Sequence, residues 1–170
     1  MTTSHRTTPD DPGAARAATA VEEPPLDALL RQRRASMRAA MGRFEDAVAA
    51  PVREDPAAWV ARVAARTAVL RDVVAEHLDG TEGRHGYYAG LIAEAPRLSR
   101  AVERLVAEHR RIEAALEDVA VLVGRTLVDR SAADPLREKA TELLVLLARH
   151  RQHGSDLLWE AYGFDVGGES

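Results

Sequence analysis

A row of apolar residues with one histidine among them, at alternating steps of four and three, constrains the fold of this chain more than any other feature. It spans residues 98 to 123, and its spacing keeps every member on one face of an α-helix. The members are Leu98, Val102, Leu105, His109, Ile112, Leu116, Val119 and Val123. A helix with such a stripe has to bury it against neighbouring elements.

Three further segments repeat this helical spacing. The first covers residues 26–49 and stops before Pro51, with the inward row Leu26, Leu30, Arg33, Met37, Met41, Phe44 and Val48. The second has Asp55 as a cap and Pro56 in its first turn, and it ends at Gly80 and Gly83. Its inward row is Trp59, Val63, Thr67, Leu70, Val74 and His77. The last follows the cap Asp134 and Pro135, with the row Leu136, Ala140, Leu143, Leu147, His150, Gly154, Leu157 and Ala161.

These four segments predict an all-α fold, an up-and-down antiparallel four-helix bundle over residues 25–163. The chain is 46% hydrophobic, mostly Ala, Leu and Val, and it lacks the alternating pattern of strands. We expect residues 87–96 to form a short apolar connection over one end of the bundle. A disordered N-terminal tail is expected over residues 1–24 and a short C-terminal tail over 164–170.

Charge and composition argue against several classes of function. A net charge of -4 disfavours nucleic-acid binding, although "RQRRASMR" at 31–38 is locally basic. The absence of cysteine excludes disulfides and thiolate metal sites. The longest strongly apolar run, "LLVLLA", is too short to span a membrane, and the N-terminus lacks the pattern of a secretory signal, so we expect a cytoplasmic protein. No catalytic triad, phosphate loop or paired acids are evident, which disfavours an enzyme.

Three of the four inward rows contain a histidine. His77 lies late in its helix, His109 lies about thirteen residues into the next, and His150 lies about fifteen residues into the last. In antiparallel helices these depths place the three imidazoles within a turn or two of one level. A buried imidazole without a polar partner costs about 1 to 3 kcal/mol, so we expect the three to share a partner.

A metal ion is the partner that such a cluster most readily accommodates. Imidazoles and carboxylates inside a helical bundle bind iron, manganese or zinc. Glu113 follows His109 by four residues on the same helix, and Glu82 follows His77 by five. The candidate ligands are therefore His77, Glu82, His109, Glu113 and His150, whereas His153 is expected to point toward a helix boundary.

Residues 26 to 162 resemble the hemerythrin-like family, which consists of four-helix bundles with inward His and Glu ligands to non-haem iron. The resemblance rests on "HLDGTEG" with "YYAGLIAEAPRL", on "EHRRIEAALEDV" and on "ARHRQHGSDLLWEAY". It implies a metal-binding or sensing protein with non-haem iron as the first candidate, and manganese, zinc or no metal as the others. The family pattern also has a histidine in the first helix, where this chain has Arg33 or Met37, so the resemblance implies an incomplete ligand set.

Several alternatives remain open at this point. The bundle is a metal-free protein-interaction module if its inward histidines are structural, and Arg33 would then replace the metal's charge by pairing with Glu82 or Glu113. Glu113 is a solvent-facing residue, or a partner of Arg110, under the same interpretation. Haem held between two histidines is a third possibility, disfavoured by the Leu and Val that fill the rows. Protein partners and oligomeric state are not indicated.

Overall fold

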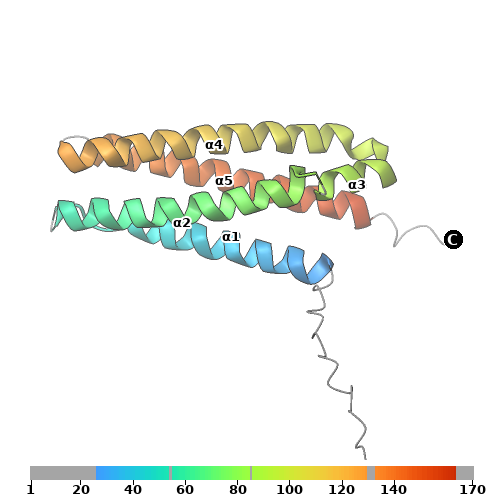
Figure 1. Ribbon diagram of the computed structural model, residues 1–170, viewed down its shortest axis with the longest axis horizontal. Coiled ribbons are helices and arrows are strands. Elements are labelled where there is room, and N and C mark those ends of the chain that lie inside the picture. The colour runs from blue at the N-terminus through green and yellow to red at the C-terminus, as the bar shows by residue number, and fades with distance from the viewer. Residues whose placement is uncertain (1–25, 54, 85, 130–132, 164–170) are drawn as a thin grey trace, which may run out of the picture.

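The described part of the chain is entirely helical. The computed structural model describes residues 26–163 except 54, 85 and 130–132, and these residues form no strand. Four long helices lie along the longest axis of the molecule (Figure 1). They are α1 (Leu26–Ala49), α2 (Pro56–Glu82), α4 (Ser99–Val128) and α5 (Ala133–Tyr162). The predicted all-α class is confirmed, whereas the predicted tails at 1–24 and 164–170 lie outside the described residues.

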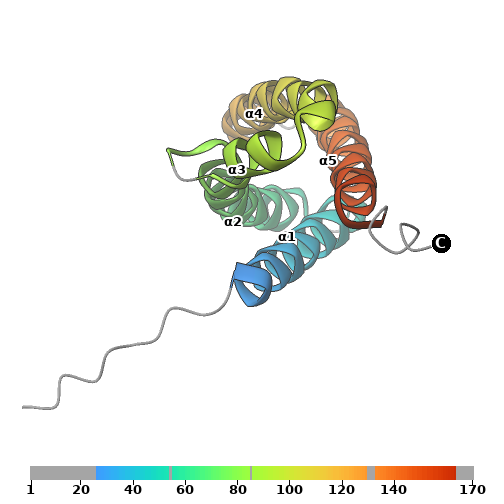
Figure 2. The same ribbon diagram turned by 90° about the vertical axis from the view of Figure 1, so that its right-hand side faces the viewer.

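The four long helices surround a common interior. α1 contacts α2 and α5, and α4 contacts the same two helices from the opposite side. Figure 2 shows this ring in end view, with α3 (Tyr87–Glu94) lying across one end. The colours in Figure 1 show the chain reversing direction between each long helix and the next. None of the described helices combines the length and the apolarity needed to cross a membrane.

Local sequence accounts for the beginning and the end of α2. The side chain of Asp55 accepts a hydrogen bond of 2.9 Å from the backbone N–H of Ala58, and Pro56 occupies the first turn, as expected. The expected break at Gly80 is wrong, because α2 continues through Gly80 to Glu82. A glycine inside a helix costs only about 1 kcal/mol relative to alanine, which tertiary packing readily offsets. The helix ends where the N–H of Gly83 donates to the carbonyl of Asp79.

Two other expected boundaries differ from the structure. α5 begins at Ala133, so Asp134 lies in the first turn of the helix rather than at the cap position. A carboxylate in the first turn still interacts favourably with the partial positive charge of the helix N-terminus. Residues 87–96 are not a simple connection, because they form α3 and enter the 3-10 turn η1 (Pro96–Leu98). Tyr88 and Leu91 of α3 are nevertheless buried against the end of the bundle, as expected.

The predicted inward rows form the core. Every member of the row at 98–123, which begins at the last residue of η1 and continues along α4, is buried. The remaining long helices bury Met41, Phe44, Val48, Trp59, Val63, Thr67, Leu70, Val74, Leu136, Ala140, Leu143, Leu147, His150 and Leu157. Arg33 and Met37 are only partly buried, so the N-terminal half of α1 covers the interior less completely than its C-terminal half.

The core is divided into two apolar clusters by a polar layer. The larger cluster joins all four long helices and includes Phe44, Trp59 and Leu143. The smaller one lies at the end capped by α3 and includes Leu98 and Leu105. On α2, His77 follows the last residue of the larger cluster. On α4 and α5, His109 and His150 lie between residues of the larger and the smaller cluster. Polar side chains with no water around them need partners within the layer itself.

Candidate metal centre

Three helices each contribute one histidine to the polar layer. His77 comes from α2, His109 from α4 and His150 from α5, and their ring centroids are 4.5 to 5.3 Å apart. One potential ligand nitrogen from each ring lies within 4.8 Å of the others. His109 and His150 are buried, and His77 is half-buried. The expected convergence of the three imidazoles at one level is therefore present in the structure.

The Nε2 atoms face one another at the centre of this cluster. His150 Nε2 lies 3.1 Å from His77 Nε2 and 3.1 Å from His109 Nε2. Metal–nitrogen bonds of about 2.0 to 2.1 Å separate neighbouring ligand atoms by about 3.3 Å in a tetrahedron and about 3.0 Å at adjacent corners of an octahedron. The two separations are thus of the size found between ligands of one metal ion.

Carboxylates bind the outward-facing nitrogens of two of these rings. Glu82, at the end of α2, is hydrogen-bonded to His109 Nδ1. Glu108 of α4 lies 3.1 Å from His150 Nδ1 and 2.6 Å from His153 Nδ1, so it connects α4 to two successive turns of α5. Both carboxylates are mostly buried, with side-chain exposures of 21% for Glu82 and 15% for Glu108. Metal-bound histidines in proteins commonly donate their second nitrogen to a carboxylate in this way.

These hydrogen bonds determine where the imidazole protons lie. An ionised carboxylate only accepts, so we assign the N–H protons of His109 and His150 to Nδ1. A neutral imidazole has a single N–H, and Nε2 of both rings therefore carries a lone pair. The two lone pairs point at each other across 3.1 Å. A proton or a metal cation between them is needed to relieve the repulsion.

Burial opposes protonation of two of the three rings. The pKa of His77 is lowered from 6.5 to about 3, mainly by burial and then by the neighbouring His150 and His109, in that order of importance. Burial also lowers the pKa of His150, followed by the effect of His109, while Glu108 opposes the shift. Neutral imidazole is the form that binds metal ions, so these environments keep His77 and His150 ready to act as ligands.

The lowered pKa of His77 makes the stability of the metal-free protein depend on pH. Between the unfolded pKa of 6.5 and the folded pKa of about 3, the unfolded chain binds more protons at this site. The free energy of unfolding is therefore expected to fall as the pH decreases below 6.5, by up to about 1.4 kcal/mol per pH unit for His77 alone. Urea unfolding of metal-free protein at several pH values between 7 and 4 would measure this slope. His77→Gln should make it shallower, and equal slopes for both proteins would contradict the assignment.

An aromatic ring closes one side of the layer. Tyr88 of α3 stacks on His109, with the ring planes 12° apart and the centroids separated by 6.1 Å. Burial raises the pKa of Tyr88, and the negative charges of Glu82 and Glu108 raise it further. The phenol therefore stays neutral, and it covers the ring of His109 on the side that faces the capped end of the bundle.

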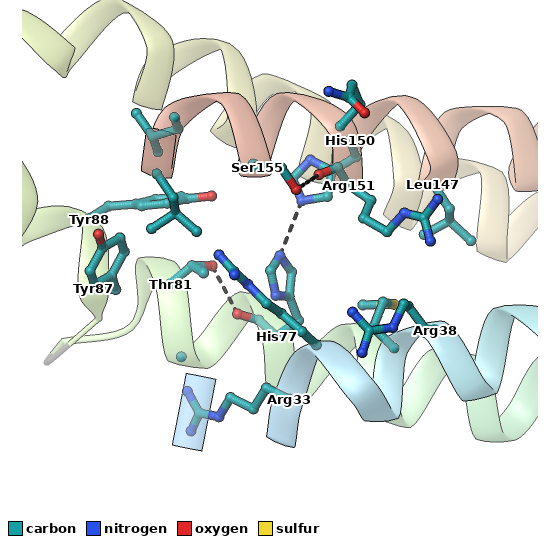
Figure 3. Close-up of a pocket in the computed structure, with 17 residues that line it drawn as sticks. Arg33, Arg38, His77, Thr81, Tyr87, Tyr88, Leu147, His150, Arg151 and Ser155 are labelled. Atoms are coloured by element: carbon teal, nitrogen blue, oxygen red, sulfur yellow. Dashed lines mark hydrogen bonds between the residues drawn. The ribbon is translucent and has the colours of Figure 1, made fainter. Parts of the chain in front are cut away.

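A cavity of about 360 Å³ lies beside the layer, and Tyr88 forms part of its wall (Figure 3). His77 and His150 form part of its wall, and α1, α2, α3 and α5 contribute the remainder. An opening beside the Nε2 atoms would let a small molecule reach a metal ion held by them.

The structure brings together four of the five candidate ligands. His77, His109 and His150 meet through Nε2, and Glu82 contacts His109 from outside the trio. Glu113 does not join them, because its side chain is exposed. Successive residues of a helix are rotated by about 100° about its axis. Relative to His109, the buried Ile112 is therefore rotated by about 60° in one direction, whereas Glu113 is rotated by about 40° in the other, away from the bundle axis.

Glu108 and His153 are the residues that the sequence interpretation missed. The same helical geometry places Glu108 about 100° from His109 on the side of the buried row, which brings it toward α5. His153 was expected to point toward a helix boundary, but it contacts Glu108 one turn beyond His150. The position of Glu108 around the helix, on the side of the buried row, is the sequence signal that could have identified it.

Arg33 does not form the ion pair expected of a metal-free relic site. Among the residues that the structure describes, the partners of Glu82 are His109 and, at 3.7 Å, Arg110. The guanidinium of Arg33 instead lies against the backbone of Gly80 at the wall of the cavity. A positive charge is therefore present where the resemblance places a first-helix ligand, but it does not neutralise the buried carboxylates.

Comparison of the chain with protein-family models, with curated proteins and with solved structures found no match.

Proposed function

We propose that this protein is a metal-binding bundle of the hemerythrin-like, up-and-down type, in which His77, His109 and His150 bind one divalent transition-metal ion. Iron is the first candidate, because the helical motifs resemble those of iron-binding bundles, and manganese and zinc are the next. Imidazole nitrogen suits iron and zinc among other first-row metals. The chain has no cysteine, so thiolate cannot contribute to the preference.

One contact carries the proposal: that between Nε2 of His109 and Nε2 of His150, each of which carries a lone pair under the proton assignment given above. His109 Nε2 and His150 Nε2 are 3.1 Å apart while Glu82 and Glu108 hold the protons of their Nδ1 atoms. A metal ion accepts both lone pairs and that of His77 as well, which converts a repulsive contact into three bonds. The carboxylates fix the ring orientations and increase the basicity of the ligand nitrogens.

Three protein ligands leave the metal with open coordination positions. Structural zinc sites usually have four protein ligands, whereas sites that bind external molecules usually have three. Since His77 and His150 line the cavity, an external ligand would approach from there. When bound, the metal would supply an electrophilic centre for that molecule, in keeping with a role in binding or sensing.

A metal-free polar layer is the rival interpretation. In that case a proton shared between Nε2 of His109 and Nε2 of His150 would take the place of the metal ion, and Glu82 and Glu108 would offset its charge. The histidines would then be structural and the protein would act through its surface as an interaction module. The two interpretations differ in whether the cluster takes up a metal ion.

Substitution of the two buried carboxylates tests the proposal. Glu82→Gln and Glu108→Gln should each weaken metal binding about 10- to 100-fold, the usual effect of losing a carboxylate that supports a histidine ligand. Glutamine retains the size of the side chain but not the charge. Isothermal titration of metal-free protein with Zn²⁺, and with Fe²⁺ under anaerobic conditions, would measure the affinities.

Glu113→Gln is the matched control for these variants. It removes the same charge from an exposed position on α4, so the metal affinity should not change. If Glu113→Gln weakens binding as much as Glu108→Gln does, Glu113 is a ligand and the arrangement proposed above is wrong. If wild-type protein binds neither metal, the metal-free interpretation holds.

A further inference from the structure

The cavity beside the histidines has an unusually basic wall. Arg33, Arg34 and Arg38 of α1 and Arg151 of α5 all line it, and Figure 3 shows Arg38 and Arg151 beside His77 and His150. No aspartate or glutamate is among its lining residues. Four arginines thus line one small cavity.

These positive charges lack partners within the described part of the chain. None of the four arginines forms an ion pair there, whereas Arg71 and Arg110 elsewhere pair with Glu117 and Glu82. A guanidinium cannot lose its proton at physiological pH, so the repulsion among the four groups persists until an anion or solvent ions offset it.

The remaining wall of the cavity suits an organic molecule. Met37, Leu147, Leu157 and Leu158 provide apolar surface, and Tyr87 and Tyr88 provide two aromatic rings. A volume of about 360 Å³ is within the range of sites that bind small molecules. A few polar groups in a mostly apolar wall orient such a ligand, and guanidinium groups match the two oxygens of a carboxylate or phosphate.

We propose that this cavity binds a small organic anion, with its carboxylate or phosphate held by the arginines of α1 and its apolar part against α5 and the tyrosines of α3. The site goes beyond the metal centre and does not require a bound metal, because the arginines supply the charge. Its position next to His77 and His150 would bring the anion to the open side of the metal centre if a metal is present.

Gly80 makes room for one of these arginines. A Cβ atom at position 80 would overlap the guanidinium of Arg33, which lies against the backbone of α2. Gly80→Ala should therefore displace Arg33 while improving the helical propensity of α2. The expected result is weaker anion binding without a lower melting temperature. This combination is not expected from a variant that merely damages the fold.

Calorimetric titration with small aromatic probes tests the anion site. Metal-free and metal-loaded protein would be titrated at constant ionic strength with benzoate, phenyl phosphate, inorganic phosphate and the neutral analogue benzamide. We expect at least one aromatic anion to bind and benzamide not to bind. Comparison of benzoate with phenyl phosphate distinguishes a carboxylate from a phosphate ligand, and inorganic phosphate shows whether the organic part contributes.

A pair of double variants shows whether the arginines of the cavity are responsible. Arg33→Gln with Arg34→Gln should weaken anion binding by about tenfold or more. The control is Arg31→Gln with Arg43→Gln, which makes the same change in charge on exposed positions of α1 that do not line the cavity, and it should bind as wild type does.

Several results would overturn the anion site. They are equal weakening by both double variants, equal binding of benzamide, and absence of binding by every anion up to about 10 mM. The metal proposal fails separately. If wild-type protein takes up no metal but still binds an anion through Arg33 and Arg34, only the metal centre is wrong.

Discussion

Replacing His150 by alanine is expected to lower the affinity for Fe²⁺ and Zn²⁺ by more than about 100-fold, beyond the usual effect of losing an outer carboxylate. His150 is central to the cluster, because its Nε2 lies 3.1 Å from the Nε2 atoms of both His77 and His109. Without it, the remaining pair would provide only two ligands. Direct titration, or competition with a chelator of known affinity, would measure the loss.

His153→Ala is the matched control for this variant. It removes a histidine from the next turn of α5, where the side chain contacts Glu108 but does not join the Nε2 cluster. We expect a much smaller decrease in metal affinity than for His150→Ala. Equal decreases for the two variants would show that the metal, if bound, is held in a different way.

Replacing Phe44 by alanine is expected to lower the free energy of unfolding by about 3 to 5 kcal/mol. Phe44 is fully buried in the larger apolar cluster, so the truncation would leave a cavity between α1 and its neighbours. α1 contains no histidine and contributes none of the proposed ligands, which leaves apolar packing as its main attachment. Denaturant unfolding of metal-free and metal-loaded protein would measure the effect.

The destabilisation by Phe44→Ala should be the same with and without metal, since the side chain lies in the apolar cluster rather than in the histidine layer. Val121→Ala on α4, where the side chain is 44% exposed, should change stability by no more than about 0.5 kcal/mol. A loss at Phe44 as small as this would mean that α1 is only loosely packed. A decrease in the free energy of unfolding that appears only with metal would show that the packing of α1 depends on metal binding.

The helical periodicity predicted the fold well because burial of one helix face dominates the packing. The row from Leu98 to Val123 is buried throughout, and the rows of the other helices follow closely. The boundaries were less predictable. Gly80 reads as a helix end, but it allows Arg33 to approach α2, and this contact between two helices is not visible in either local sequence. Residues 87–94 form a helix although they are too few for a strong periodic pattern.

The sequence also predicted the three histidines, since position along antiparallel helices determines their level. It could not predict the carboxylates equally well. Glu113 follows His109 at a spacing compatible with binding one metal ion, yet its side chain is exposed, and Glu108 contacts the cluster instead, through His150. That difference depends on how α4 is rotated relative to α5. The basic cavity was likewise not predictable, because Arg151 joins the arginines of α1 only through tertiary packing.

Elemental analysis of tag-free protein purified without chelators would test the central claim most directly. Iron, manganese and zinc would be quantified per chain, both as isolated and after anaerobic loading with Fe²⁺. We expect about one metal ion per chain, as three ligands converging on one point imply, and almost none in the His77→Ala, His109→Ala, His150→Ala triple variant. Metal near zero in loaded wild-type protein, or equal amounts in the triple variant, would contradict the proposed centre.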